Sequence, residues 1–115
     1  MNITLDMVAE VCHEAGRAFQ RRLGIELNPS WDEAPEEMKE DLIGQVKLTL
    51  AGSSPRSLHE SWMREKKKDG WSYGKDLDEE NKKHPHFVPY HHLPHEQLFS
   101  NKIFVSIVRS FREPF

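Results

Sequence analysis

Apolar residues return every three or four positions in four segments of the chain, which is typical of helices that bury one face. The segments run from Thr4 to about Leu23, from Pro35 to about Leu50, from Pro55 to about Asp69, and from Pro94 to about Phe111. A hydroxyl stands just before the third segment, at Ser54, where it can cap a helix. We therefore predict a mainly α fold with about four helices.

No helical or strand period is visible from Gly70 to Leu93, where glycine, proline and acidic residues dominate. A structureless segment of this length is uncommon in a compact domain and is often functional. Because its aromatic residues can pack on the core, we expect an ordered loop, which can include short extended pieces around Phe87 to Tyr90. The aromatic residues of the loop are Trp71, Tyr73, Phe87 and Tyr90.

The fourth segment has a wide apolar face. Its members are Leu98, Phe99, Ile103, Phe104, Ile107, Val108 and Phe111. A face of this width can be entirely core, or part of it can form a subunit interface. We expect self-association, as a two-fold homodimer.

Length and charge indicate one globular domain that does not coat nucleic acid. A chain of 115 residues supports one core. Its 16 Lys and Arg stand against 19 Asp and Glu, a formal net charge of −3. Since bulk nucleic-acid binding needs a basic surplus, we exclude that class of protein.

The use of cysteine and the lack of long apolar runs indicate a cytoplasmic protein. Cys12 is the only cysteine, which excludes an internal disulfide framework and a multi-thiolate zinc site and points to a reducing compartment. The apolar runs are only a few residues long, and the N-terminal segment carries charged residues. We therefore expect no membrane span and no secretory signal.

The sequence contains no motif for catalysis, cofactor binding or metal binding. A nucleophile elbow, a phosphate-binding loop and a Cys–His catalytic signature are absent from it, so we expect neither an enzyme nor a cofactor. Several histidines gather near the end of the loop, but Pro94 interrupts any helix through them and no thiolate accompanies them. We therefore expect no physiological metal site. These histidines are His84, His86, His91, His92 and His95.

Irregularly spaced residues between His59 and Gln97 form a distinctive pattern. It consists of a His-Glu and a Trp on a helix, then Gly-Trp-x-Tyr-Gly, a Lys, a His-Pro, a Val-Pro-aromatic and a Leu-Pro. The residues are His59, Glu60, Trp62, Gly70, Trp71, Tyr73, Gly74, Lys82 or Lys83, His84, Pro85, Val88, Pro89, Tyr90, Leu93 and Pro94. This pattern resembles the RyR domain, the ryanodine receptor repeat. The upstream part, with His13, Glu14 and the run from Trp31 to Lys39, is similar to the N-terminal extension of small bacterial and bacteriophage members.

The resemblance implies a helical fold with a long hairpin-like loop, able to hold a small β-ribbon, between the third and fourth helices. It divides the chain into a helical extension, residues 1–55, packed on an RyR-like repeat, residues 56–115, in one compact domain. One copy of the repeat is present, and no internal repeat is visible in the sequence. In the channels, paired repeats face each other across a Trp-lined cleft associated with adenine nucleotides. The resemblance therefore implies a binding role rather than a catalytic one.

Aromatic and basic residues of the loop and the third helix form the predicted ligand site. The rings can stack on a purine, and the ammonium and imidazole groups can hold a phosphate. The predicted ligand-binding residues are Trp71, Tyr73, His59, Trp62, Lys82, Lys83, His84 and Tyr90.

Every one of these residues also has a structural interpretation. The rings can cover the core, and Trp62 already fits the buried stripe of its helix. The lysines can pair with the acidic residues just before them. A partly buried His59 can hydrogen-bond a backbone carbonyl and so hold the loop.

Two functions from different classes follow. The first is a non-catalytic module that binds a small molecule, an adenine-type nucleotide or a nucleotide-derived signal, as in a bacterial or phage conflict system. The second is a protein-interaction or structural module with no small-molecule ligand. If the chain is phage-encoded, its compartment is the cytoplasm of the bacterial host.

Overall fold

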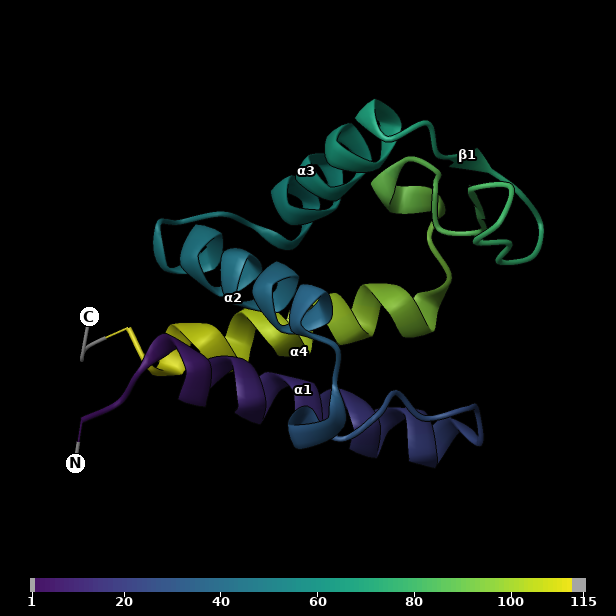
Figure 1. Ribbon diagram of the computed structural model, residues 1–115. Helices are drawn as coiled ribbons and strands as arrows, with labels where there is room; N and C mark the ends of the chain where they lie inside the picture. Colours follow the sequence, from purple (N-terminus) through teal and green to yellow (C-terminus); the bar gives the residue numbers. More distant parts are fainter. Residues whose placement is uncertain (1, 113–115) are drawn as a thin grey trace.

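The computed structural model describes residues 2–112 and is mainly helical (Figure 1). Its α-helices are α1 (Leu5–Leu23), α2 (Glu36–Leu50), α3 (Pro55–Lys68) and α4 (His95–Ser110). The predicted four-helix fold, with a long loop between the third and fourth helices, is confirmed. None of the helices in the described part of the chain combines the length and the apolarity that crossing a membrane requires.

The helix ends lie where local sequence signals place them. The Thr4 hydroxyl accepts a hydrogen bond from the Met7 backbone N–H at 3.2 Å, and α1 ends at Gly24 in the left-handed conformation. The Ser54 hydroxyl accepts from the Ser57 N–H in the same way, with Pro55 in the first turn of α3. Thr4 and Ser54 satisfy backbone donors that would otherwise lack partners in the first turns of α1 and α3.

The core lies where α1, α2 and α4 meet. Its most buried cluster is Val8, Ala9, Cys12, Trp31, Val46 and Val108. In Figure 1, α1 and α4 run side by side beneath α2, while α3 and the loop after it form a separate upper part. α3 contacts α2 and α4, so the two parts meet along one edge and diverge away from it.

A small parallel sheet closes the loop between α3 and α4. Strand β1 (Ser72–Tyr73) pairs with β2 (Lys83–His84), with Ser72 opposite Lys83. The extended pieces expected around Phe87 to Tyr90 do not form strands, since a 3-10 turn, Tyr90–His92, begins there. The prolines on either side of Phe87 lack the N–H that a sheet ladder requires, which explains the difference.

Two glycines of the Gly-Trp-x-Tyr-Gly motif are required by the backbone of this loop. Gly70 ends α3 with φ of 90°, a conformation that other residues rarely adopt. At Gly74, a Cβ atom would stand 2.5 Å from the Cβ of Lys83 on the paired strand. A side chain at position 74 would therefore separate β1 from β2.

The two halves of the chain repeat one arrangement, which corrects the expectation of a chain without an internal repeat. In the first half, His13 Nε2 on α1 donates a hydrogen bond to the Pro29 carbonyl at 2.7 Å. In the second half, His59 Nε2 on α3 donates to the Val88 carbonyl, also at 2.7 Å. Each histidine thus ties its helix to the connection that leads into the next helix.

The connections themselves correspond step by step. Two residues after the accepting carbonyl, an aromatic ring packs on the histidine: Trp31 at 5.6 Å from His13 and Tyr90 at 6.1 Å from His59, between ring centroids. Both rings begin a 3-10 turn, which leads through a buried apolar residue and a proline into α2 or α4.

Residues at equivalent positions of the two units are also buried alike. Ala34 and Leu93 are the buried residues before the two prolines. Cys12 and Leu58 precede the two histidines and are both buried. Counted from the prolines, Val46 of α2 matches Val105 of α4, and Thr49 matches Val108; all four are buried. The chain is therefore an internal pair of α-turn-α units.

Candidate functional site

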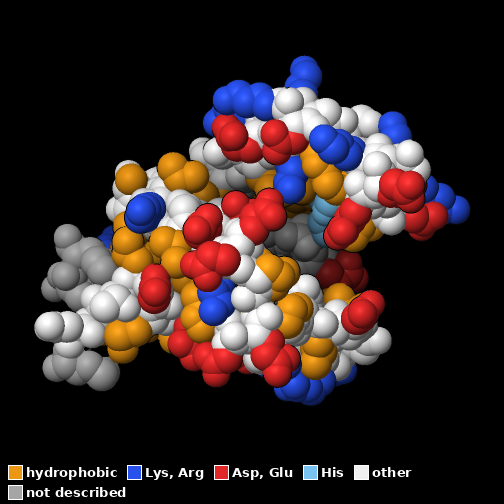
Figure 2. Space-filling view, viewed as in Figure 1, with side chains coloured by type: hydrophobic (Ala, Val, Ile, Leu, Met, Phe, Trp, Pro, Cys, Tyr) orange, Lys and Arg blue, Asp and Glu red, His pale blue; other side chains and the backbone are white. Residues whose placement is uncertain are grey.

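A cleft of about 350 Å³ lies between the upper and lower parts of the molecule. Figure 2 shows it as a recess with hydrophobic and histidine side chains inside, and charged side chains of both signs around it. α3 and the loop supply one wall, α1 supplies the opposite wall, and α4 and α2 supply the remaining residues. All four helices therefore shape the cleft.

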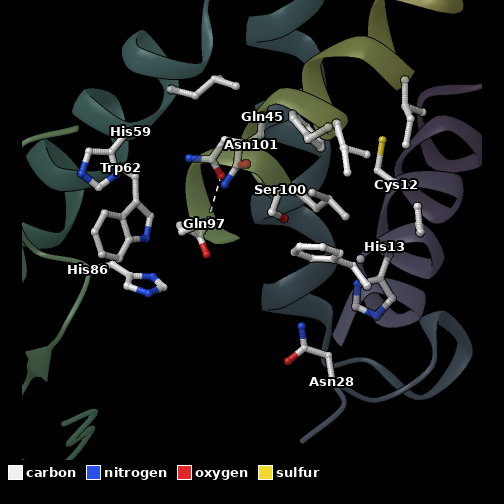
Figure 3. Close-up of a pocket in the computed structure, with 18 of the residues that line it drawn as sticks. Cys12, His13, Asn28, Gln45, His59, Trp62, His86, Gln97, Ser100 and Asn101 are labelled. Atoms are coloured by element: carbon white, nitrogen blue, oxygen red, sulfur yellow. Dashed lines mark hydrogen bonds between the residues drawn. The ribbon is translucent and has the colours of Figure 1, made fainter. Parts of the chain in front are cut away.

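Trp62 dominates the wall made by α3 and the loop. Its ring stacks on His59, with centroids 5.6 Å apart and an angle of 24°, and meets the His84 ring edge-on at 4.9 Å. Phe87 packs on it from the loop at 6.1 Å. These contacts fix the half-buried indole, which also lines the cleft. Figure 3 shows Trp62 beside His59 and His86 on this wall.

Polar side chains of α4 lie between this wall and α1. Gln97 Nε2 donates to Asn101 Oδ1 at 2.9 Å, across one helical turn. This bond uses one donor and one acceptor, which leaves the Gln97 carbonyl oxygen and the Asn101 amide N–H groups to serve a further partner. Figure 3 places both amides between the Trp62 wall and His13 on α1.

The cleft lining holds the titratable imidazole groups of His13, His59, His84 and His86. Among the described residues that line it there is no Asp, Glu, Lys or Arg. Burial, together with the neighbouring His86, Lys66 and His59, lowers the pKa of His84 to about 4. Burial also lowers the pKa of His86. In addition, the His86 N–H donates to His84 Nδ1 at 3.0 Å, which requires that nitrogen to be unprotonated.

The state of His84 predicts that the protein loses stability in mild acid. Because the pKa of His84 is lower in the folded chain than in the unfolded chain, the unfolded chain binds the proton first as the pH falls. The stabilisation is complete above about pH 6.5, the unfolded value, and declines toward about pH 4, the folded value. Urea denaturation at about pH 7 and about pH 5 measures this decline.

The control is His84→Asn, since the asparagine carbonyl can still accept from the His86 N–H but does not titrate in this range. We expect a smaller loss of stability between the two pH values in this variant. An unchanged pH dependence would contradict the role of His84.

The structure brings three of the predicted ligand-binding residues into the cleft and leaves five outside its lining. His59, Trp62 and His84 line it. The five that do not are Trp71, Tyr73, Lys82, Lys83 and Tyr90. The structural role expected of His59 is confirmed, because it hydrogen-bonds the Val88 carbonyl and so holds the loop.

The five remaining residues are engaged elsewhere in the loop or exposed. The Trp71 ring lies under Lys66, whose Nζ is 5.0 Å from its centroid, and Tyr73 is 56% exposed. Lys82 Nζ donates to the Asp69 carbonyl, and Lys83 Nζ donates to the Ser72 hydroxyl. Tyr90 packs on His59 and does not line the cleft.

Sequence reasoning missed the polar residues that α1, α2 and α4 contribute. In the sequence, Gln97 and Asn101 look like ordinary surface residues of an amphipathic helix, and no pattern identifies them as residues of a binding site. His13 carried a usable signal, because His13-Glu14 repeats the His59-Glu60 pair. The other polar lining residues that were missed are Gln45 and Ser100 and, from the connection between α1 and α2, Asn28; His86 of the loop was considered only as a metal ligand.

Cys12, the single cysteine of the sequence, is buried. Burial raises the pKa of the Cys12 thiol to about 12, so the nucleophilic thiolate is scarce. Within residues 2–112, no three His, Cys, Asp or Glu side chains are placed to hold a metal ion together.

Comparison with known protein families gives a match that covers most of these elements. The family model described as RyR domain matches residues 31–109. The matched stretch begins at Trp31 and includes α2, α3 and the loop with β1 and β2, and it ends within α4. It spans more than half of the chain.

Proposed function

The chain belongs to the RyR domain family, and from that premise we propose that it is a non-catalytic module that binds a small molecule in the cleft. The proposed ligand is a nucleotide or a nucleotide-derived signal. The observation that carries the proposal is the cleft itself, a space of about 350 Å³ with a fixed indole on one wall and no Asp, Glu, Lys or Arg among its described lining residues. Small-molecule sites are commonly of this kind, mostly apolar with a few placed polar groups.

The side chains in the cleft suit a heteroaromatic ring. An indole such as that of Trp62 can stack on a base, a contact worth about 1 to 3 kcal/mol in single-strand binders. The Gln97 carbonyl and the Asn101 amide N–H groups that this bond does not use offer an acceptor and a donor one helical turn apart. This combination matches the edge of a base such as adenine, which presents a donor next to an acceptor.

Calorimetric titration with adenine and guanine nucleosides, mononucleotides and cyclic nucleotides tests the proposal. We expect at least one of them to bind in the micromolar range, since stacking and two hydrogen bonds supply only moderate affinity. If none binds below about 1 mM, the proposed function is wrong.

The absence of Lys and Arg from the described lining predicts that binding depends on the base rather than on the phosphates. Since Lys82 and Lys83 bond to their own loop and do not line the cleft, a nucleoside and its monophosphate should bind with similar affinity. Raising the salt concentration should change that affinity little, because salt screens interactions between charges. Affinity that rises with each phosphate and falls with salt would assign the ligand to the lysines instead.

A protein-interaction module without a ligand is the second candidate. Its support is an apolar area on α1 and α4, where Phe99 is 55% exposed and packs on Phe19 at 5.8 Å between ring centroids. In this candidate the area is the contact of a homodimer. Light scattering at micromolar concentration would find only the 13.5 kDa species if the contact does not form.

The location of the protein is part of the proposal. We place it in the cytoplasm, that of a bacterial host if the chain is phage-encoded. A single cysteine, buried in the core, is compatible with a reducing compartment.

A further inference from the structure

Because the chain is an internal pair of units, a residue that lines the cleft from one unit has an equivalent position in the other unit. Trp62 lies three residues after His59 on α3, and Gly16 lies three residues after His13 on α1. Both Trp62 and Gly16 line the cleft. At this position, therefore, one unit projects a large indole and the other has no side chain.

The missing side chain leaves usable space. A Cβ atom at Gly16 would meet no other atom within 4 Å, so neighbouring residues do not require a glycine there. Gly16 is not among the glycines with positive φ, so the backbone does not require one either. It stands one turn beyond Cys12 and His13, whose side chains Figure 3 shows on the α1 wall.

We propose that Gly16 is the size-determining residue of the cleft: it leaves open the room into which the ligand's ring system fits. A large side chain at Gly16, like that of its counterpart Trp62, would occupy this room. The identity of the ligand in this inference rests on the proposed function. The open space at Gly16 does not, because it can be measured in the protein without a ligand.

The lining defines the class of ring system that this room accepts. It offers an aromatic wall, an acceptor and a donor one helical turn apart, and no Asp, Glu, Lys or Arg among the described residues. The part of the ligand that enters is therefore an uncharged planar heterocycle with hydrogen-bonding groups on one edge.

Matched glycine-to-tryptophan variants test this inference. Gly44 is the control, because it is also helical, also has no atom within 4 Å of an added Cβ, and does not line the cleft. Titrated with adenosine and guanosine, Gly16→Trp should lose at least about tenfold in affinity for whichever nucleoside binds the wild type, and Gly44→Trp should lose less than about twofold. Wild-type affinity in Gly16→Trp would overturn the proposal.

The thermal stability of the variants separates blocking from unfolding. Both substitutions replace a mid-helix glycine, so we expect melting temperatures at or above that of the wild type. If Gly16→Trp unfolds, Gly16→Ala and Gly16→Leu provide a graded series. Affinity should then fall as the side chain grows, and equal affinities along the series would overturn the proposal.

A ligand-free measurement keeps the inference distinct from the proposed function. In Gly16→Cys, the new thiol should react with N-ethylmaleimide in the native protein nearly as fast as in urea. The wild type provides the background, since Cys12 is 7% exposed and burial raises its pKa to about 12. If the new thiol reacts with N-ethylmaleimide much more slowly in the native protein than in urea, the space at Gly16 is closed and the proposal is wrong. A reactive thiol in a protein that binds no nucleoside would support the open space at Gly16 and reject the proposed function.

Discussion

Replacing His59 with alanine is expected to lower the free energy of unfolding by about 2 to 4 kcal/mol. His59 is 8% exposed, and its Nε2 donates to the Val88 carbonyl at 2.7 Å. The alanine variant leaves that carbonyl without its donor and also opens a cavity between Trp62 and Tyr90, whose rings pack on His59. Urea denaturation followed by far-ultraviolet circular dichroism measures the loss.

The internal pair of units supplies a second variant with the same expected effect. His13 is also 8% exposed and donates to the Pro29 carbonyl at the same distance, so His13→Ala should be destabilising to a similar degree. His91→Ala is the control, since this exposed imidazole should contribute no more than about 0.5 kcal/mol. Losses for His13 and His59 no larger than that of the control would contradict the role of the two bonds.

The sequence predicted the helix boundaries because the signals that set them are local. The capping bonds of Thr4 and Ser54 depend only on residues within one turn. The buried face of α1 was harder to predict, since it depends on which helices pack beside it. Met7 and Val11 follow the apolar period but are 37% and 45% exposed, while Ala9 is fully buried against the core.

The site was predicted less well than the fold because the conformation of the loop decides which rings meet the cleft. From the sequence, Trp62 and Trp71 were both candidates for stacking. The turn at Gly70 and the bond from the Trp71 N–H to the Lys66 carbonyl place Trp71 next to the Lys66 side chain. Trp62 instead lines the cleft. No local pattern encodes this difference.

The internal pair is hard to recognise in the sequence because, apart from the His-Glu pair and the proline before α2 and α4, matched core positions share burial rather than residue identity. Thr49 in the first unit takes the place of Val108 in the second, and its hydroxyl donates to the Gln45 carbonyl of its own helix. A helix can bury a hydroxyl that is bonded in this way, so a threonine and a valine occupy equivalent core positions. Comparison of identities alone would not align them.

Replacing Trp62 with alanine is expected to reduce ligand affinity by about 5- to 150-fold, which corresponds to the stacking contribution of about 1 to 3 kcal/mol. The same change should destabilise the fold by about 2 to 4 kcal/mol, less than for a fully buried indole, because Trp62 is half-buried against His59, His84 and Phe87. Calorimetry and urea denaturation measure the two effects separately.

Two further variants show whether Trp62 acts through stacking or only through the fold. Trp62→Phe retains an aromatic face and most of the packing, so it should keep the fold and lose only part of the affinity. Trp71→Ala removes an indole that packs on Lys66 outside the lining of the cleft, and it should leave affinity unchanged. If Trp71→Ala abolished binding while Trp62→Phe preserved it in full, the ligand would lie on the loop, because a ring in the cleft cannot be insensitive to the indole that forms its wall.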